Sequence, residues 1–260
     1  MTDAPDPEQN HLLAALPESL KPEIFATLKL VEMELGAVVY ESDQPITSVY
    51  FPTNCIVSLL YVTQDGASAE ISVIGNEGLV GVTVALGGNS TPNRAVVQSA
   101  GFAYQMPVAF MKQQFDSCVE LRMLTLRYTL TLITQMSQTA VCNRHHSIDQ
   151  QLCRWLLLAL DRVPGNQLEM TQGLIANMLG VRREGVTEAA CKLQRLGAIR
   201  YKRGHIEVLD RSRLEALCCE CYGAVRRETE RLAHQTRNAQ TPVGPAAPDP
   251  PESAESKEPQ

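Results

Sequence analysis

The segment at residues 171–199, TQGLIANMLGVRREGVTEAACKLQRLGAI, constrains the fold more than any other part of the sequence. Counted from Gln172, the fifth residue is the small Ala176 and the ninth is Gly180. Two helices that cross closely need a small residue at the crossing, and the turn between them needs a residue that tolerates positive φ. The spacing therefore predicts a helix-turn-helix. We expect five apolar side chains to fill the space between its helices: Leu179, Val181, Val186, Ala189 and Leu193.

The second helix of this motif carries polar side chains near its start. Arg183, Glu184, Thr187 and Glu188 follow Arg182 there. Such side chains can read base edges in the DNA major groove, with Arg at guanine and Glu at cytosine N4. The alternative is a generic amphipathic helix pair whose charged face is only solvated. Arg182 fits the motif less well, because Ser or Thr is the usual residue before a helix.

A basic segment, RYKRGHIEVL, follows the motif at residues 200–209. It predicts a hairpin, or wing, whose Arg200, Lys202 and Arg203 contact the phosphate backbone. The first helix of the motif would begin after Thr171, at the same surface. We therefore predict DNA contacts for eight residues: Thr171, Arg182, Arg183, Glu184, Thr187, Glu188, Lys202 and Arg203.

The distribution of charge supports this interpretation, although the total charge does not. The 260-residue chain has a formal net charge of −6. Residues 178–203 nevertheless contain seven Lys or Arg and only two Glu, a local excess of five positive charges. Local potential, and not the total, governs binding to a polyanion.

The hydrophobic period changes twice before the motif. Apolar residues at residues 11–30 follow helical spacing and predict one or two short helices. From residue 38 to residue 107, short β-prone runs alternate with turn signals such as SDQP, QDGAS and GGNSTPN. Many short strands at such spacing predict a small antiparallel barrel or sandwich.

A long helix is predicted at residues 118–143, which contain neither proline nor glycine. One stripe on it steps by four and three residues, as a seam between helices does. Its members are Leu126, Leu130, Ile133, Ser137 and Ala140. The stripe indicates a dimer contact, and the alternative is burial against the chain's own barrel. A second helix is predicted at residues 148–162.

Several function classes are disfavoured by what the sequence lacks. No apolar run has the length of a secretion signal or a membrane span, and the eight cysteines form no short disulfide framework. We expect a cytoplasmic protein with mostly reduced thiols. No hydrolase, Walker-type or zinc-hydrolase motif occurs, so we do not expect an enzyme. The Pro-rich residues 238–260 are predicted to be disordered.

Short strands with a glycine-rich turn, a long helix and a winged helix-turn-helix follow one another over residues 11–214. This order resembles the Crp–Fnr family of bacterial transcription regulators, to which the catabolite activator protein belongs. In the DNA-binding helix, Arg183-Glu184 match the Arg-Glu pair of that family. Glu188 stands where the family often has a further Arg, so a different preferred DNA sequence is expected.

The resemblance implies an α+β fold with three parts. Residues 11–115 would form a cyclic-nucleotide-binding-type β-roll (a double-stranded β-helix), residues 116–146 a dimerisation helix, and residues 147–214 a winged helix-turn-helix. A C-terminal helix is expected at residues 215–237. The implied function is that of a homodimeric transcription regulator that binds a pseudo-palindromic DNA site, with RNA polymerase as a further partner.

The resemblance also implies a ligand cassette in the roll. In the family a Gly-Glu pair is followed by a loop and then by Arg-Ser or Arg-Ala; here Gly81 and Arg94-Ala95 match, but Val82 replaces the carboxylate that would accept a ribose hydroxyl. The residues expected at such a site are Gly78, Gly81, Arg94, Ala95 and Ser137. We therefore expect no cofactor and no tight binding of cyclic AMP. A different effector is one alternative. In the other, the glycines only turn corners and Arg94 pairs with an acid.

Two further groups carry reactive side chains. Cys218, Cys219 and Cys221 cluster near the C-terminus, and His145-His146 lie at the expected hinge before the DNA-binding part. A metal ion or an iron–sulfur cluster needs about four ligands. No second cysteine pair lies at suitable spacing, so we expect structural thiols and no metal site. The histidines are either a polar helix end or a pH or metal switch.

Two alternatives to a DNA-binding regulator with an effector-sensing roll stay open at this point. One is a cyclic-nucleotide-type binding module that regulates a protein partner. Such a module has no need of the basic residues 178–203. The other is a regulator that senses redox state through its thiols, in which case oxidation or alkylation would change its affinity for DNA.

Overall fold

The computed structural model describes residues 4–239, and side chains through residue 233. Its N-terminal part begins with the short helices η1 (Pro7–Gln9), α1 (His11–Ala14) and α2 (Lys21–Ala26). The helical spacing at residues 11–30 was therefore correctly assigned only as far as Ala26. Leu30 already lies in a strand, because its backbone pairs with Tyr104.

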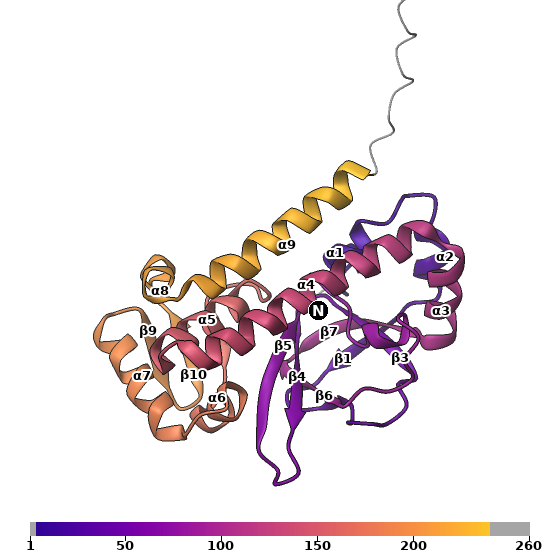
Figure 1. Cartoon of the computed structure of the whole chain (residues 1–260). Helices are drawn as coiled ribbons and strands as arrows, with labels where there is room; N and C mark the ends of the chain where they lie inside the picture. The colour runs from indigo at the N-terminus through magenta and orange to yellow at the C-terminus, as the bar shows by residue number, and fades with distance from the viewer. Residues whose placement is uncertain (1–3, 240–260) are drawn as a thin grey trace, which may run out of the picture.

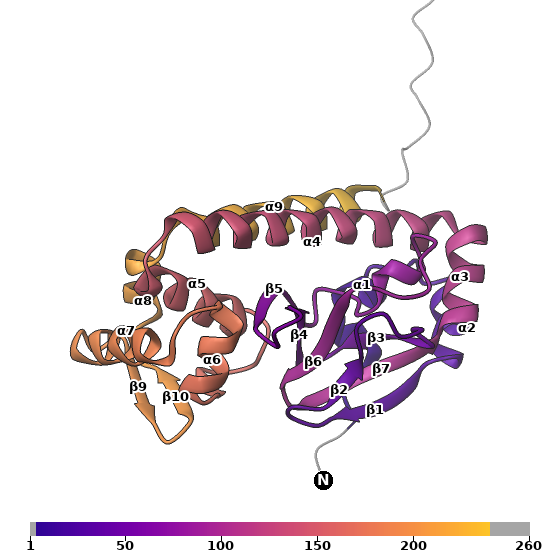
Figure 2. The same cartoon turned by 60° about the horizontal axis from the view of Figure 1, so that its bottom comes forward.

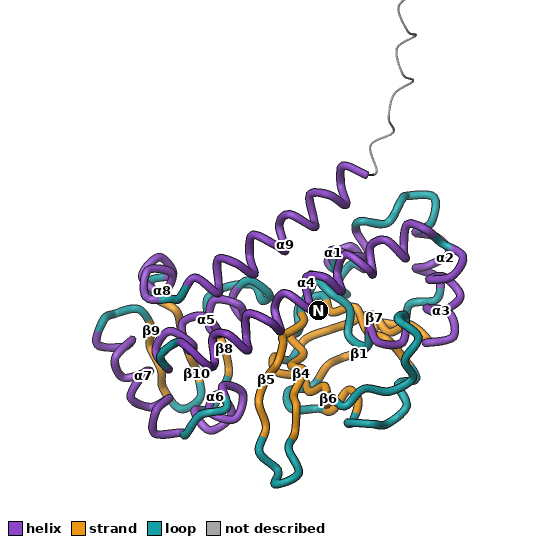
Figure 3. The backbone as a smooth tube through the Cα atoms, in the orientation of Figure 1, coloured by secondary structure: helices purple, strands orange, loops and turns teal. Residues whose placement is uncertain are grey.

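The strands form two antiparallel sheets that face each other as a roll (Figures 1 and 3). One sheet has the order β1-β7-β3 and the other the order β2-β6-β4-β5. Ala95 and Val97, two residues apart on β6, are both buried in the roll core, as expected for side chains on one face of a strand. The bounds are β1 (Lys29–Met33), β2 (Val38–Tyr40), β3 (Ser48–Pro52), β4 (Ile56–Val62), β5 (Ser68–Ile74), β6 (Asn93–Ser99) and β7 (Gly101–Pro107). The predicted α+β fold with an N-terminal β-roll is confirmed.

Two helices leave the roll. Helix α3 (Val108–Ser117) follows β7. The sequence analysis did not predict it as a helix separate from the long helix after it. The 27-residue helix α4 (Val119–His145) then extends from the roll toward the C-terminal part, as Figure 2 shows. The predicted long helix was thus placed within two residues at each end. One of its faces packs on the roll through Leu121, Leu124 and Leu132.

The C-terminal part is a small winged helix-turn-helix domain. Its first helix is almost wholly buried and begins with a capping box, in which Ser147 and Gln150 satisfy each other's backbone N–H groups. A three-stranded sheet of order β8-β10-β9 lies beside the helix pair. The bounds are α5 (Ile148–Leu160), β8 (Gln167–Glu169), α6 (Gln172–Leu179), α7 (Arg183–Arg195), β9 (Ile199–Lys202), β10 (His205–Val208) and α8 (Arg211–Leu217).

The roll and the helix-turn-helix domain share a buried contact. Trp155 of α5 belongs to the same apolar cluster as Ile56 and Val73 of the roll. Glu70 of β5 is buried there, and this burial raises the pKa of its carboxyl to about 7. A salt bridge of 2.8 Å between Arg162 and Glu77 adds to the contact. The two parts are therefore held together by side chains as well as by α4.

The last helix, α9 (Glu220–Ala239), turns back along α4 toward the roll (Figures 1 and 2). The sequence predicted one C-terminal helix at residues 215–237, whereas the structure divides it into α8 and α9 at Cys218 and Cys219. Most of the predicted disordered tail, residues 240–260, lies outside the described residues. No helix within residues 4–239 has the length and apolar character to cross a membrane.

Candidate nucleic-acid interface

The predicted helix-turn-helix is confirmed at α6 and α7. The Thr171 hydroxyl caps α6 by accepting a hydrogen bond from the Leu174 N–H at 3.3 Å. Gly180 ends α6 in the left-handed conformation, with a φ of 65°. The small Ala176 is buried at the helix crossing. Each residue thus has the conformation or burial that its position in the motif requires.

The five side chains expected between the helices all lie on one core. Leu179, Val186, Ala189 and Leu193 are buried, and Val181 is half-buried against the same cluster. Since Val186, Ala189 and Leu193 lie on the inner side of α7, its polar residues lie on the outer side.

The outer surface of α7 carries exposed charges. Arg182, Arg183, Glu184 and Glu188 are exposed. Arg182 precedes the helix without forming a side-chain cap, as its residue type led us to expect. Thr187 differs from these residues. Its hydroxyl donates to the Arg183 carbonyl at 3.0 Å and lies 2.9 Å from Gln172 Oε1, so it links α7 to α6.

The wing is a two-residue hairpin between β9 and β10. Lys202 pairs with His205, and the turn residues Arg203 and Gly204 have φ values of 50° and 86°. Positive φ at both turn residues suits the twist of a tight hairpin. Lys202 and Arg203 are exposed, whereas the Arg200 guanidinium forms an ion pair of 2.5 Å with Glu207 on the facing strand.

Four cations on this surface have no acidic partner. Arg182, Arg183, Lys202 and Arg203 form no ion pair with any other residue between 4 and 233. An unpaired cation keeps its full attraction for an external anion such as phosphate. The predicted interface therefore presents positive charge that the protein does not neutralise itself.

The predicted helix stripe on α4 is exposed in the single chain. Leu130 and Ile133 are 51% and 53% exposed, and Ser137 and Ala140 continue the row. The row also extends toward the start of α4 through Leu126, Met123 and Val119, all exposed and again in steps of three and four. This arrangement excludes burial of the stripe against the chain's own roll. A long exposed apolar row on a helix is typical of a protein interface.

The predicted ligand cassette has contacts of its own. Gly81, with a φ of 90°, turns the chain into a short 3-10 helix, η2 (Val82–Val84), and Val82 is buried in the roll core. Arg94 Nε lies 3.0 Å from Glu41 Oε2, an ion pair without hydrogen-bond geometry. Ala95 is buried in β6. These contacts favour the alternative in which Arg94 pairs with an acid.

The two other cassette residues face different surroundings. A Cβ on Gly78 would lie 2.4 Å from the Tyr128 hydroxyl, so this glycine makes room for a side chain of α4. Ser137 lies on the exposed stripe, where its hydroxyl donates to the Ile133 carbonyl at 2.9 Å. A cavity of about 500 Å³ lies between α1, α4 and α9, and none of the five cassette residues lines it.

A comparison with known protein families agrees with the helix-turn-helix and wing described above. The sequence of residues 150–217 matches the model of the Crp-like helix-turn-helix domain. Residues 150–217 are a Crp-like helix-turn-helix domain. No curated protein matches the chain in sequence.

Solved structures extend the likeness of the fold beyond residues 150–217. A protein from Eubacterium rectale assigned to the Crp/Fnr family has 18% identity and a TM-score of 0.63, covering 81% of this chain and 98% of its own. FixK2 from Bradyrhizobium japonicum has 17% identity and a TM-score of 0.61, covering 74% and 98%. The c-di-GMP-responsive global regulator CLP from Xanthomonas campestris has 15% identity and a TM-score of 0.59, covering 74% and 99%. The fold is thus that of Crp/Fnr regulators.

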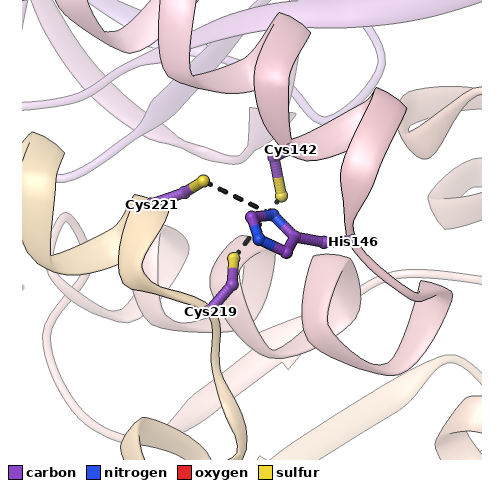
Figure 4. A group of neighbouring side chains, drawn as sticks. All are labelled: Cys142, His146, Cys219 and Cys221. Atoms are coloured by element: carbon purple, nitrogen blue, oxygen red, sulfur yellow. Dashed lines mark hydrogen bonds between the residues drawn. The ribbon is translucent and has the colours of Figure 1, made fainter.

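Next to the Crp-like domain, the structure gathers four side chains that sequence spacing did not connect (Figure 4). Cys142 and His146 come from the end of α4, and Cys219 and Cys221 from the start of α9. Cys142 and His146, one helical turn apart, thus lie beside Cys219 and Cys221 as a second pair of potential ligands, which the search for a second cysteine pair did not find. Cys219 lies 77 residues beyond Cys142, and only the return of α9 along α4 joins them.

The pKa values of the thiols in this group shift in different directions. A hydrogen bond with Cys219 raises the pKa of Cys142, and burial raises the pKa of Cys221 to about 11. Burial raises the pKa of Cys55 and of Cys153 to about 12, which keeps both protonated. In contrast, hydrogen bonds from Cys142 and then from Cys218 lower the pKa of Cys219. Among the three thiols of the group, the pKa is thus lowered at Cys219 and raised at Cys142 and Cys221.

Proposed function

We propose that the protein is a homodimeric, sequence-specific DNA-binding transcription regulator of the Crp/Fnr type. The observation that carries the proposal is the exposed surface of the Crp-like domain. There Arg182, Arg183, Lys202 and Arg203 form no ion pair with any residue between 4 and 233. Helix α7 enters the major groove, and the wing contacts the phosphate backbone. A cytoplasmic location and contact with RNA polymerase belong to the same proposal, as expectations from the family resemblance.

The exposed stripe of α4 supports the dimer. Two copies that join along this stripe place their α7 helices around a two-fold axis, so the DNA site is a pseudo-palindrome. Half-sites for a motif of this type lie about one helical turn apart, roughly 10–10.5 base pairs from centre to centre.

Selection of bound sequences from random DNA tests this function. The purified full-length protein is expected to enrich a pseudo-palindrome with two half-sites at that spacing. Recovery of DNA with no shared sequence, together with weak salt-sensitive binding, would contradict the proposal. That result would favour the alternative of a binding module for a protein partner.

The wing should act on affinity alone. Replacing Lys202 or Arg203 with alanine removes a cation that we expect to contact a DNA phosphate. All DNA sequences are therefore expected to bind more weakly. The slope of log affinity against log salt concentration should fall by about one for each cation removed. Gel-shift titrations at several salt concentrations measure this slope. Lys112→Ala serves as the control, because Lys112 lies half-buried on α3, outside the Crp-like domain, and its ammonium donates a hydrogen bond to Asn89 of the roll. A changed sequence preference in a wing variant would contradict this role.

The roll is proposed not to bind cyclic AMP tightly. Val82 is buried and offers no acceptor, and Arg94 already has Glu41 beside it. A ribose hydroxyl buried against valine loses a hydrogen bond, at a cost of about 1–3 kcal/mol, or roughly one to two decades of affinity.

Calorimetric titration with cyclic AMP and cyclic GMP tests this prediction. We expect no binding, or weak binding that Arg94→Ala leaves unchanged. Micromolar or tighter binding of cyclic AMP that Arg94→Ala abolishes would refute it and make the protein a nucleotide-gated regulator.

A further inference from the structure

A cluster of four potential metal ligands lies where α4 ends and α9 begins (Figure 4). Cys142 lies in the last turns of α4, and His146 caps that helix. Cys219 and Cys221 flank Glu220, the first residue of α9. Cys142, Cys219 and Cys221 are buried, and His146 is half-buried. The group thus comprises three thiols and one imidazole, with little access to water.

The distances within the cluster match those around a single tetrahedral ion. Bonds of about 2.3 Å to sulfur and about 2.0 Å to nitrogen place neighbouring ligand atoms of a tetrahedron about 3.5–3.8 Å apart. Here Cys142 Sγ lies 3.6 Å from Cys219 Sγ, and Cys221 Sγ lies 3.5 Å from His146 Nδ1. All four ligand atoms lie within 4.8 Å of one another. An iron–sulfur cluster binds its thiolates on separate iron atoms and needs a wider cage.

The imidazole of His146 is oriented for a metal at Nδ1. Its Nε2 lies 3.3 Å from a carboxylate oxygen of Glu220, while Nδ1 faces the thiol of Cys221. A carboxylate that accepts the Nε2 proton leaves the Nδ1 lone pair free for a metal. Such a carboxylate–histidine pair regularly accompanies a metal-bound imidazole and fixes its tautomer and orientation.

A buried cation completes the surroundings. Arg154 of α5 is buried and interacts electrostatically with Cys142 and Cys221. It also interacts electrostatically with the buried Glu70 of β5, and its Nε has no hydrogen-bond partner among residues 4–233. Two of its nitrogens instead lie 3.3 Å from the Thr139 hydroxyl. Three thiolates around one divalent ion carry one net negative charge, which this guanidinium offsets.

We propose that Cys142, His146, Cys219 and Cys221 bind one Zn²⁺ per chain in a closed, structural Cys₃His site. Zinc is the divalent ion for which three thiolates and an imidazole in a tetrahedron are most typical. The ion joins the end of α4, which precedes the Crp-like domain in the sequence, to the start of α9, which follows it. Binding releases the thiol protons to solvent, and the ion itself undergoes no redox change.

Metal analysis of the full-length protein tests the site directly. The protein is purified under reducing conditions without chelators, and zinc is measured by mass spectrometry. We expect about one zinc per chain. After removal with a chelator, titration with Co²⁺ should produce the visible bands of tetrahedral cobalt and thiolate-to-cobalt charge-transfer bands. The chelated protein should also melt at a lower temperature, and zinc should restore the original value.

Matched variants test the assignment of ligands. Cys219→Ser is expected to lower the zinc content to about a tenth or less of the wild-type value. Cys218→Ser is the control, since Cys218 is the adjacent cysteine but does not belong to the four-ligand group, and it should retain zinc. Glu220→Gln should weaken zinc binding about 10–100-fold, because it loosens the orientation of His146. Glu220 is a surface residue, so this variant remains informative even if Cys219→Ser fails to fold.

Three results would overturn the proposal. The first is a reduced wild-type protein that contains no zinc and gives no tetrahedral cobalt spectrum. The second is an equal loss of zinc in Cys218→Ser and Cys219→Ser. The third is recovery of several iron atoms and inorganic sulfide per chain, which would indicate a cluster in place of a single ion. These readouts do not involve DNA, so they are independent of the proposed function.

Discussion

Ile133→Asp is expected to convert the protein from a dimer to a monomer. Ile133 is 53% exposed in the single chain and lies at the middle of the apolar row on α4. An aspartate there stays hydrated in the monomer, but it would be buried without a partner in a dimer. The fold of each chain should therefore persist while the association fails. Sedimentation velocity measures the mass, and circular dichroism checks the fold.

The same variant should lose most of its affinity for a two-fold DNA site. A dimer binds its second half-site as an intramolecular step, and the loss of that advantage is expected to cost about 10²–10⁴-fold. Leu35→Asp is the matched control, because Leu35 is 48% exposed but lies on the roll, away from α4. A stable Ile133→Asp dimer would show that the interface lies elsewhere on the molecule.

Arg183→Ala is expected to weaken binding to the preferred DNA site by about 1–3 kcal/mol and to relax preference at one base position. Arg183 is exposed at the start of α7, without an acidic partner in the described chain, so its guanidinium is free to form two hydrogen bonds to guanine. Binding to unrelated DNA should change much less. Selection of sequences with the variant, followed by gel-shift titration on single-base substitutions, measures both effects.

Arg195→Ala is the matched control for this prediction. Arg195 is exposed on the same helix but at its opposite end, so its loss should leave base preference unchanged. If Arg183→Ala keeps the full specificity of the wild type, then α7 does not dock in the major groove through its first turn.

Features that depend on neighbouring residues could be predicted from the sequence. Gly180 and Ala176 were placed correctly because a tight turn and a close helix crossing each restrict one position to a small residue. The stripe through Leu130 and Ile133 was found because a helix repeats its surface every three or four residues. The short strands predicted only a small antiparallel barrel or sandwich, and the β-roll was expected from the family resemblance.

Features that depend on distant residues could not be predicted in this way. Gly78 looks like part of an anion-binding turn, yet what the structure places against it is Tyr128, fifty residues later. The four-ligand cluster is a second case, because Cys142 and Cys219 meet only after α9 folds back on α4. The spacing of residues that are close in sequence does not indicate that α9 folds back on α4. The one available signal was a cysteine and a histidine four residues apart near the end of a predicted helix.

Helix α9 also limits how the Crp-like domain can move. A domain that is attached only through residues 146–147 could swing about that single connection. Here the domain is attached to α4 at both of its ends, through Ser147 at the start of α5 and through α9, which returns along α4. Rotation about Ser147 therefore has to slide α9 along α4 or separate the two helices. Motion of this kind is shear between packed helices, in which interlocked side chains permit only small displacements.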